Sequence, residues 1–153
     1  MAESESGKLA PITPYLYYED VAGALEWLSR AFGFREREQE TMRSPEGKVV
    51  HASMELGEGV ILMGCPGADY ECPKRLGRVT QNLYVYVDDV EQHFQRARSA
   101  GATILSALED TFYGDRRYGA ADVEGHHWYF AEKVREMTPD QWQPSREDLK
   151  GHG

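Results

Sequence analysis

The sequence lacks any long apolar segment. Its apolar runs, such as residues 60–63, are far shorter than the roughly 20 residues that a helix needs to cross a bilayer. Residues 1–8 are acidic and polar, and they contain no apolar stretch of the kind found in a secretory signal peptide. From these absences we expect a cytoplasmic protein that has no membrane partner.

Cysteine is also scarce, with two residues in the whole chain. Cys65 and Cys72 are spaced too widely for the usual zinc-binding pairs, and the segment between them contains proline and glycine, as loops do. Because the chain shows no secretion signal, we expect two free thiols in a connecting loop. A disulfide between them is the alternative.

The sequence also lacks an excess of basic residues. The 17 Lys and Arg residues are outnumbered by 26 Asp and Glu residues, which gives a formal net charge of −9. This charge repels phosphate backbones, so we expect no nucleic-acid partner, whereas cationic ligands are tolerated or attracted. The 153 residues, 41% of them hydrophobic and 28% charged, fit a globular chain of about one domain, and nine are tyrosine.

The most informative feature that is present is an internal repeat. Residues 12–34 and 81–102 share an alternating segment, an Asp-Val pair and a helical run that ends near a glycine. The alignment places Thr13 with Asn82 and Asp20 with Asp89. Each alternating segment has the period of a strand, and each aspartate is suited to cap the helix that follows.

Each predicted helix carries one apolar stripe at helical spacing. The stripes comprise Val21, Ala24, Leu25, Leu28 and Phe32 in the first copy, and Val90, Phe94, Ala97 and Ala100 in the second. Gly33 and Gly101 follow the stripes, at positions where a residue that tolerates positive φ is favoured.

Three strand-like segments follow each helix. They cover residues 34–42, 48–56 and 60–63 in the first copy, and residues 103–108, 112–121 and 126–131 in the second. The sequence therefore predicts an α+β fold of two tandem β-α-β-β-β modules. That their mixed sheets curl around a cavity is implied by a family resemblance described below. We assign residues 11–64 to module one and residues 79–134 to module two, within one domain of residues 11–134. Residues 1–10 are expected to form an N-terminal arm, and residues 135–153 a C-terminal tail.

The predicted strands have two different faces. One face is aliphatic and suits packing under the helices, as with Leu16 and Val85. The other face combines tyrosine with polar groups, as the linings of small-molecule pockets do. The ligand-binding residues predicted on this face are Tyr15, Tyr17, His51, Asn82, Tyr84, Tyr86, His127 and Tyr129. A solvated sheet face is the alternative interpretation of the same pattern.

The segment around Arg116 offers further candidates. Tyr113 and Tyr118 flank Arg116 and Arg117, whose planar guanidinium groups could hold a carboxylate or carbonyl oxygen of a ligand. Tyr113, Arg116 and Tyr118 therefore join the predicted ligand-binding residues. The alternative is that Arg116 pairs with a nearby acid, for example Asp122.

Glu55 lies opposite His51 in the predicted strand pattern, and the two could form an acid–base pair or an ordinary cross-face contact. If the pocket is enzymatic without a metal, Glu55 as a base and Arg116 as an oxyanion partner are the candidate catalytic residues.

The second copy ends in a segment that resembles a known superfamily. Residues 113–116 read Tyr-Gly-Asp-Arg, and residues 122–128 read Asp-Val-Glu-Gly-His-His-Trp. They are similar to the aromatic-Gly-x-Arg and Asp-Pro-x-Gly-x-x-aromatic signature of the vicinal oxygen chelate superfamily, with Val123 where proline is usual. This superfamily includes glyoxalase I, bleomycin-resistance proteins and extradiol dioxygenases. The resemblance spans about residues 11–134 and implies a two-module fold around a cavity that a second subunit completes, hence a homodimer.

The resemblance also implies where metal ligands would lie. In the metal-dependent members, His, Glu or Gln side chains project from the first and last strands of each module. The corresponding positions here are Thr13, Leu62, Asn82 and Tyr129. These side chains cannot supply three or four His or carboxylate donors, so we predict no metal and no cofactor. The alternative is a substitute set of His51, Glu55 and His127.

Without a metal, the resemblance points to members of the bleomycin-resistance type, which sequester a bulky cationic or aromatic ligand and perform no chemistry. A tyrosine-rich cavity in a protein of net charge −9 suits such a ligand, because ring faces attract cations. We therefore predict a small-molecule binding protein, similar to antibiotic-resistance proteins, that holds an aromatic or cationic ligand. A glyoxalase- or dioxygenase-like metalloenzyme with non-standard ligands is the second hypothesis.

Overall fold

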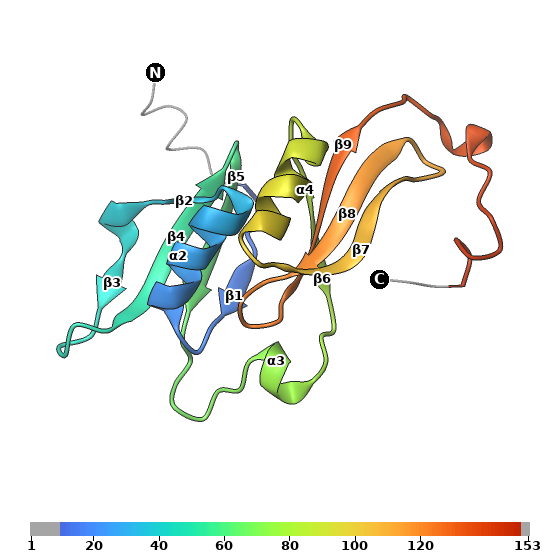
Figure 1. Cartoon of the computed structure of the whole chain (residues 1–153). Coiled ribbons are helices and arrows are strands. Elements are labelled where there is room, and N and C mark those ends of the chain that lie inside the picture. The colour runs from blue at the N-terminus through green and yellow to red at the C-terminus, as the bar shows by residue number, and fades with distance from the viewer. Residues whose placement is uncertain (1–9, 151–153) are drawn as a thin grey trace, which may run out of the picture.

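The computed structural model describes residues 10–150, so most of the expected N-terminal arm and the last three residues of the expected tail lie outside the described part. The chain forms two mixed sheets (Figure 1). The first sheet contains, in spatial order, β1 (Tyr15–Tyr17), β5 (Gly59–Gly64), β4 (Val49–Leu56) and β2 (Arg35–Glu36), with β3 (Met42–Arg43) also paired to β4. The second contains β6 (Asn82–Tyr86), β9 (His127–Lys133), β8 (Asp115–Ala121) and β7 (Thr103–Asp110).

The two sheets repeat one topology. β1 pairs in parallel with β5, β6 pairs in parallel with β9, and the remaining strand pairs are antiparallel. Helix α2 (Val21–Phe32) follows β1, and helix α4 (Val90–Ser99) follows β6. The predicted α+β fold of two β-α-β-β-β modules is confirmed. Tyr15 of β1 is the register partner of Leu62 in β5, and Tyr84 of β6 is the register partner of Tyr129 in β9. Tyr15 and Tyr84 therefore occupy equivalent places in the repeat.

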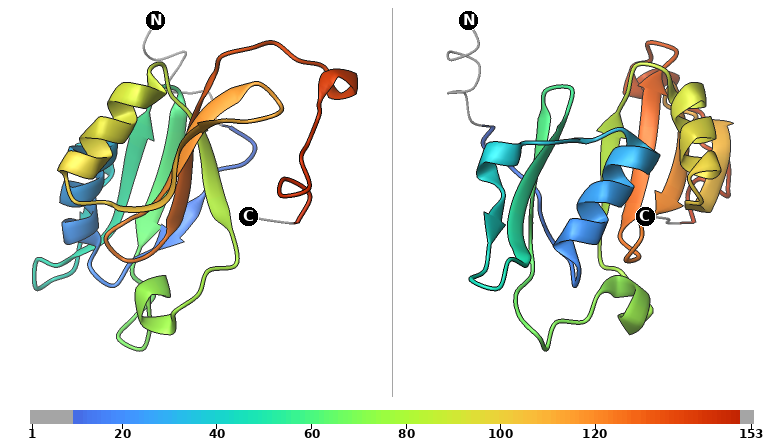
Figure 2. Two further views of the ribbon diagram at one scale, coloured as in Figure 1. Left: turned by 45° about the vertical axis from the view of Figure 1, so that its right-hand side comes forward. Right: turned by 60° about the vertical axis from the view of Figure 1, so that its left-hand side comes forward.

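The helix boundaries follow from local side-chain chemistry. The Asp20 side chain accepts a hydrogen bond from the Gly23 amide at the start of α2, and Asp89 accepts one from the Gln92 amide at the start of α4. At the end of α2, Gly33 adopts a φ of 80°, which an L-residue with a Cβ rarely adopts. Figure 2 shows α2 and α4 on the same side of the two sheets.

The core lies between the helices and the aliphatic sheet faces. Phe32 of α2 contacts Trp128 and Phe130 of β9, whose own rings are nearly parallel. The predicted helical stripes and strand residues such as Leu16 belong to this one cluster. Burial of these aromatic side chains provides the main driving force for packing the two modules together.

Buried hydrogen bonds join the modules at the turn between β8 and β9. Asp122 Oδ2 accepts hydrogen bonds from the Tyr18 hydroxyl at 2.6 Å and from the Trp128 indole at 3.0 Å. The Glu124 carboxylate accepts from the amides of Glu19 and Asp20 at the start of α2. This turn of module two is therefore fixed to the first helix of module one.

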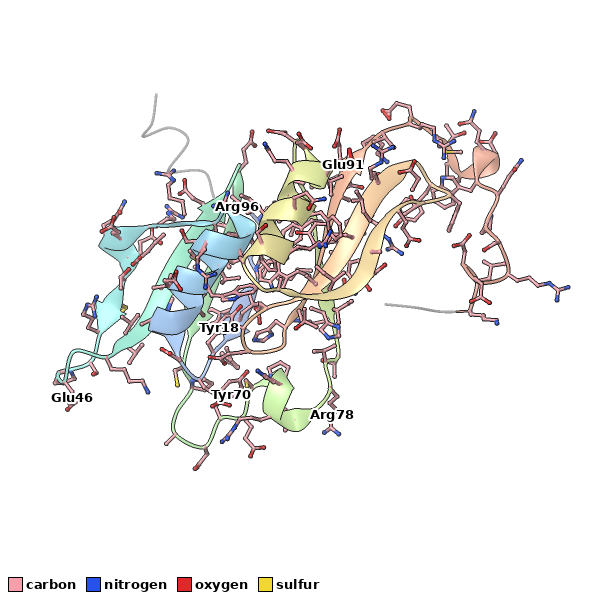
Figure 3. All side chains as sticks on the ribbon, in the orientation of Figure 1. Tyr18, Glu46, Tyr70, Arg78, Glu91 and Arg96 are labelled. Carbon is pink, nitrogen blue, oxygen red and sulfur yellow. The ribbon has the colours of Figure 1, made fainter. Side chains whose placement is uncertain are left out.

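The two helices also cap each other. Arg96 of α4 donates hydrogen bonds to the carbonyl oxygens of Ser29 and Arg30, and Arg30 of α2 donates to the Ala100 carbonyl. Figure 3 shows Arg96 where α2 and α4 lie side by side. His93 Nε2 lies 2.8 Å from the Phe32 carbonyl, so it carries the proton and donates. The carbonyls left unpaired at both helix ends thus find cationic or N–H partners from the other module.

One predicted strand is broken. Residues 34–42 were expected to form a continuous strand, but only Arg35 and Glu36 pair with β4 before a short 3₁₀ helix at Glu38–Glu40. The turn is held by local side-chain contacts, because Thr41 Oγ1 donates to Glu36 and Arg37 pairs with Glu40. Such local bonds compete with the strand ladder.

The connector between the modules contains the short helix α3 (Pro73–Leu76). The Lys74 amide donates to the Glu124 carbonyl, which attaches the connector to the β8–β9 turn. Cys65 and Cys72 at its start are free thiols, as expected. Within residues 10–150, no helix is both long enough and apolar enough to cross a membrane.

Candidate ligand-binding site

The sheet faces opposite α2 and α4 carry most of the predicted ligand-binding residues, and we call them the open faces of modules one and two. Strand alternation buries Leu16 under the helices and leaves Tyr15 and Tyr17 about half exposed, at 49% and 50%. In module two, Tyr84 and Tyr86 are 39% and 57% exposed. Large aromatic side chains grouped on an exposed face are typical of an interaction or ligand site.

On the open face of module one, Tyr15 contacts His51 and occupies the space that a glycine leaves. The Tyr15 hydroxyl lies 3.0 Å from His51 Nδ1, and its ring contacts Tyr17 edge to face at a centroid distance of 5.8 Å. A Cβ at Gly64 would lie 2.6 Å from the Tyr15 hydroxyl oxygen, so the missing side chain provides the space for this ring. Tyr70 of the connector donates to the Tyr17 carbonyl at 3.0 Å and closes one side of the group.

A cavity of about 280 Å³ lies beside these tyrosines. It is lined by Tyr15, Tyr17, Val50, Gly64, Cys65 and Pro66. Its volume is near the lower limit for small-molecule pockets. A second cavity, of about 400 Å³, lies between α2 and the β2–β4 region; none of the predicted ligand-binding residues lines it.

On the open face of module two, a buried carboxylate organises the tyrosines. Asp115 Oδ2 accepts hydrogen bonds from the hydroxyls of Tyr84 at 2.8 Å and Tyr86 at 2.7 Å, and Oδ1 lies 3.1 Å from Lys133 Nζ. Tyr113 extends the group, because its hydroxyl lies 3.0 Å from that of Tyr84. The hydroxyls therefore point inward to Asp115, while parts of the Tyr84 and Tyr86 rings stay accessible.

The same contacts keep these hydroxyls protonated. Burial, followed by hydrogen bonds to Tyr113 and Asp115, raises the pKa of Tyr84 well above its usual value. Burial and the hydrogen bond to Asp115 raise the pKa of Tyr86 to about 12. Both phenols thus remain neutral donors at physiological pH.

Tyr129 lies flat across β8 and beneath a guanidinium group. A Cβ at Gly119 would lie 2.6 Å from Tyr129 Cε2, so only glycine leaves room for this ring position. The Arg117 guanidinium carbon lies 5.1 Å from the centre of the Tyr129 ring, within the range of a cation–π contact. Arg117 Nη2 also lies 3.7 Å from Glu109 Oε2.

Two predicted ligand-binding residues lie elsewhere. Tyr118 is fully buried on the helix-covered face, where its hydroxyl lies 2.5 Å from His93 Nδ1. Arg116 lies on the same side of β8 as Tyr118 and forms a two-contact ion pair with Asp110, at 2.7 and 3.2 Å. The alternative that Arg116 pairs with a nearby acid thus agrees with the structure, but the acid is Asp110, while Asp122 is engaged with Tyr18 and Trp128. The alternation of β8 sends even-numbered residues toward α4, so Arg116 and Tyr118 are not part of the open face.

The remaining candidates are separated from each other. His51 contacts Tyr15, whereas Glu55 forms ion pairs with Arg35 and Arg37, so these two side chains have different partners. His127 lies in the other sheet, as the register partner of Asn82. Across residues 10–150, no group of three or more His, Cys, Asp or Glu side chains is arranged to hold a metal ion. The substitute set of His51, Glu55 and His127 is therefore not assembled.

The sequence interpretation missed Asp115 and the two glycines that seat aromatic rings. Asp115 stands at the variable position of the aromatic-Gly-x-Arg pattern, which assigns no role to its side chain. A signal was present, because strand alternation places Asp115, Arg117 and Gly119 on one face of β8. Nothing in the sequence distinguishes Gly64 and Gly119 from turn glycines.

Comparison with known proteins gives a consistent result. Residues 8–130 match the family described as the Glyoxalase/Bleomycin resistance protein/Dioxygenase superfamily. An uncharacterized protein of Mycobacterium bovis is 34% identical over 138 residues, covering 86% of this chain and 89% of that protein.

Solved structures agree with this match. The crystal structure of TioX from Micromonospora sp. ML1 has a TM-score of 0.64 and 35% identity, covering 84% of this chain and 100% of that one. A glyoxalase-related enzyme from Clostridium phytofermentans has the same TM-score at 12% identity, covering 83% of this chain and 97% of the other. At that identity, the likeness concerns the fold alone.

Proposed function

Because the chain belongs to the Glyoxalase/Bleomycin resistance protein/Dioxygenase superfamily, we propose that it binds a small aromatic or cationic molecule on its open faces without a catalytic metal. The observation that carries the proposal is the pair Tyr84 and Tyr86, whose hydroxyls donate to buried Asp115 while their rings stay partly exposed. A phenol that donates to a carboxylate gains electron density in its ring, which strengthens attraction to cations and electron-poor rings.

The charges on the open faces refine the expected ligand. Asp115 forms an ion pair with Lys133, and Glu55 forms ion pairs with Arg35 and Arg37, so neither carboxylate is an isolated negative charge. Recognition is expected to depend on stacking against the tyrosine rings, with a positive ligand charge adding to it.

We further propose that the protein acts in the cytoplasm as a homodimer. The open faces leave four tyrosines between 39% and 57% exposed, and a second copy that covers them would remove this aromatic surface from water and enclose the ligand. Light scattering coupled to size exclusion tests the dimer, because a monomer has a mass of 17.4 kDa and a dimer about twice that. A monomer at micromolar concentration would contradict it.

Three probes separate the chemical features of the ligand. Ethidium is a planar aromatic cation, tetraethylammonium is a cation without a ring, and naphthalene-2-sulfonate is an aromatic anion. Calorimetric titration of EDTA-treated protein should show ethidium binding most tightly and tetraethylammonium most weakly. Failure of all three to bind, or a divalent metal retained in stoichiometric amount after purification, would contradict the proposal and favour the metalloenzyme hypothesis.

Variants locate the binding to the open face. Replacing Tyr86 with alanine removes a half-exposed ring, and we expect roughly tenfold weaker ethidium binding. Leu76→Ala is the matched control, because Leu76 is similarly exposed but lies on α3 in the connector. Equal losses in both variants would contradict a site at the open face.

A further inference from the structure

The C-terminal tail returns to module two after β9. The amides of Val134 and Arg135 both donate to the Gly114 carbonyl, and the Arg135 side chain reaches the Thr111 carbonyl. Gly114 has a φ of 101°, and a Cβ there would collide with the Arg135 carbonyl oxygen. The tail thus crosses directly over the turn that precedes β8.

The next tail segment is locally ordered. Thr138 and Gln141 form a capping box around the 3₁₀ helix Pro139–Gln141, and Trp142 follows at its end. The Trp142 ring contacts Phe112 at 5.8 Å and Tyr113 at 6.4 Å between centroids, both edge to face. Figure 2 (left) shows the tail on the side of the sheets away from α2 and α4, which is the side of the open faces.

These contacts continue the aromatic group of the open face. Tyr113 bonds through its hydroxyl to Tyr84, and the Tyr84 ring contacts Tyr86 edge to face at 5.6 Å. Trp142, Tyr113, Tyr84 and Tyr86 therefore form one connected series from the tail to the sheet. Trp142 keeps 41% of its surface exposed, so part of the indole is available to a ligand.

We propose that Trp142 is a ligand-contacting residue, and that the C-terminal tail forms an aromatic wall of the module-two site. The tail lies beyond residues 8–130, the part of the chain that matches the superfamily. Residues 143–150 are mostly polar, and Trp142 lies outside the core cluster, where its ring contacts Phe112 and Tyr113. The proposal rests on the proposed function and deepens it, since it favours a planar ring that can lie against the exposed parts of the indole and the tyrosine rings.

Ethidium titration of four proteins tests the proposal. The proteins are the wild type, Trp142→Ala, a chain truncated after residue 136, and Leu149→Ala. Leu149 is the matched control, because it is an apolar tail residue that is 71% exposed. We expect ethidium to bind roughly threefold to tenfold more weakly to Trp142→Ala and to the truncated chain than to the wild type. The ethidium affinity of Leu149→Ala should equal that of the wild type.

Two further readouts separate contact from loss of structure. The melting temperatures of all four proteins should agree closely, because the tail lies outside the core cluster. Ethidium should also quench a tryptophan emission component that Trp142→Phe lacks. Equal ethidium affinity in the wild type and Trp142→Ala would overturn the role of Trp142 while leaving the proposed function intact. Absence of binding in the wild type would overturn both.

Discussion

Replacing Asp115 with asparagine should destabilise the protein by about 3 kcal/mol. The buried carboxylate accepts from Tyr84 at 2.8 Å and from Tyr86 at 2.7 Å, and it lies 3.1 Å from Lys133 Nζ. Asparagine has the same shape but offers one acceptor oxygen, and its amide group would face at least one of these donors. An unsatisfied buried donor costs about 1–3 kcal/mol, and breaking a buried ion pair about 3–5 kcal/mol.

The expected value is at the lower end of the ion-pair range because the Lys133 side chain is 44% exposed and partly screened by solvent. Urea denaturation measures the difference directly from the midpoints and slopes. Asp110→Asn is the matched control: Asp110 also pairs with a basic side chain, that of Arg116, but the Asp110 side chain is about half exposed. Its free energy of unfolding should change much less.

A tyrosine titration provides an independent readout of the same substitution. Loss of the negative charge at residue 115 should lower the pKa of Tyr86 from about 12 toward its ordinary value, since a nearby anion opposes phenolate formation. Ultraviolet absorbance between pH 9 and pH 12.5 follows the phenolate. If the Asp115→Asn variant matched the wild type in both its free energy of unfolding and its tyrosine titration, Asp115 would not be what holds the Tyr84 and Tyr86 rings in place.

Three other perturbations test separate parts of the structure. Gly119→Ala should displace the Tyr129 ring, because the added Cβ would lie 2.6 Å from Tyr129 Cε2. This variant should bind ethidium more weakly in calorimetric titration, while its melting temperature should change little. Burial lowers the pKa of His93 to about 4, so the unfolded chain binds this proton more readily. The free energy of unfolding should therefore fall by up to about 3 kcal/mol as the pH drops from 6.5 through 4, and His93→Gln should reduce this dependence in denaturation series. Tyr18→Phe leaves Asp122 without its 2.6 Å donor and should cost about 1–3 kcal/mol in urea denaturation.

Much of the fold could be predicted because local signals and the repeat agreed. Asp20 and Asp89 were identified as caps from residue type and spacing, and both accept the expected amide hydrogen bonds. The apolar stripes indicated which helix faces are buried, and the alternation in β1 and β6 indicated which tyrosines are exposed. Each signal depends on neighbours within a few residues, and the second copy supported the first.

The parts that could not be predicted depend on contacts between distant segments. Arg116 and Tyr118 lie on the helix-covered face of β8, and the sequence interpretation of this segment did not assign alternate residues to opposite faces. The break after Glu36 results from side-chain contacts such as Thr41 to Glu36, which no periodicity reveals. The position of Trp142 beside Tyr113 depends on how the tail crosses Gly114, and this requires the folded module.

The central claim is that the open faces bind an aromatic or cationic ligand without a metal. The most direct test is calorimetric titration of ethidium into EDTA-treated protein, with Tyr86→Ala and Leu76→Ala titrated in parallel. We predict saturable binding to the metal-free wild type and to Leu76→Ala, and roughly tenfold weaker binding to Tyr86→Ala. Binding that appears only after a divalent metal is added, or that is equal in all three proteins, would contradict the claim.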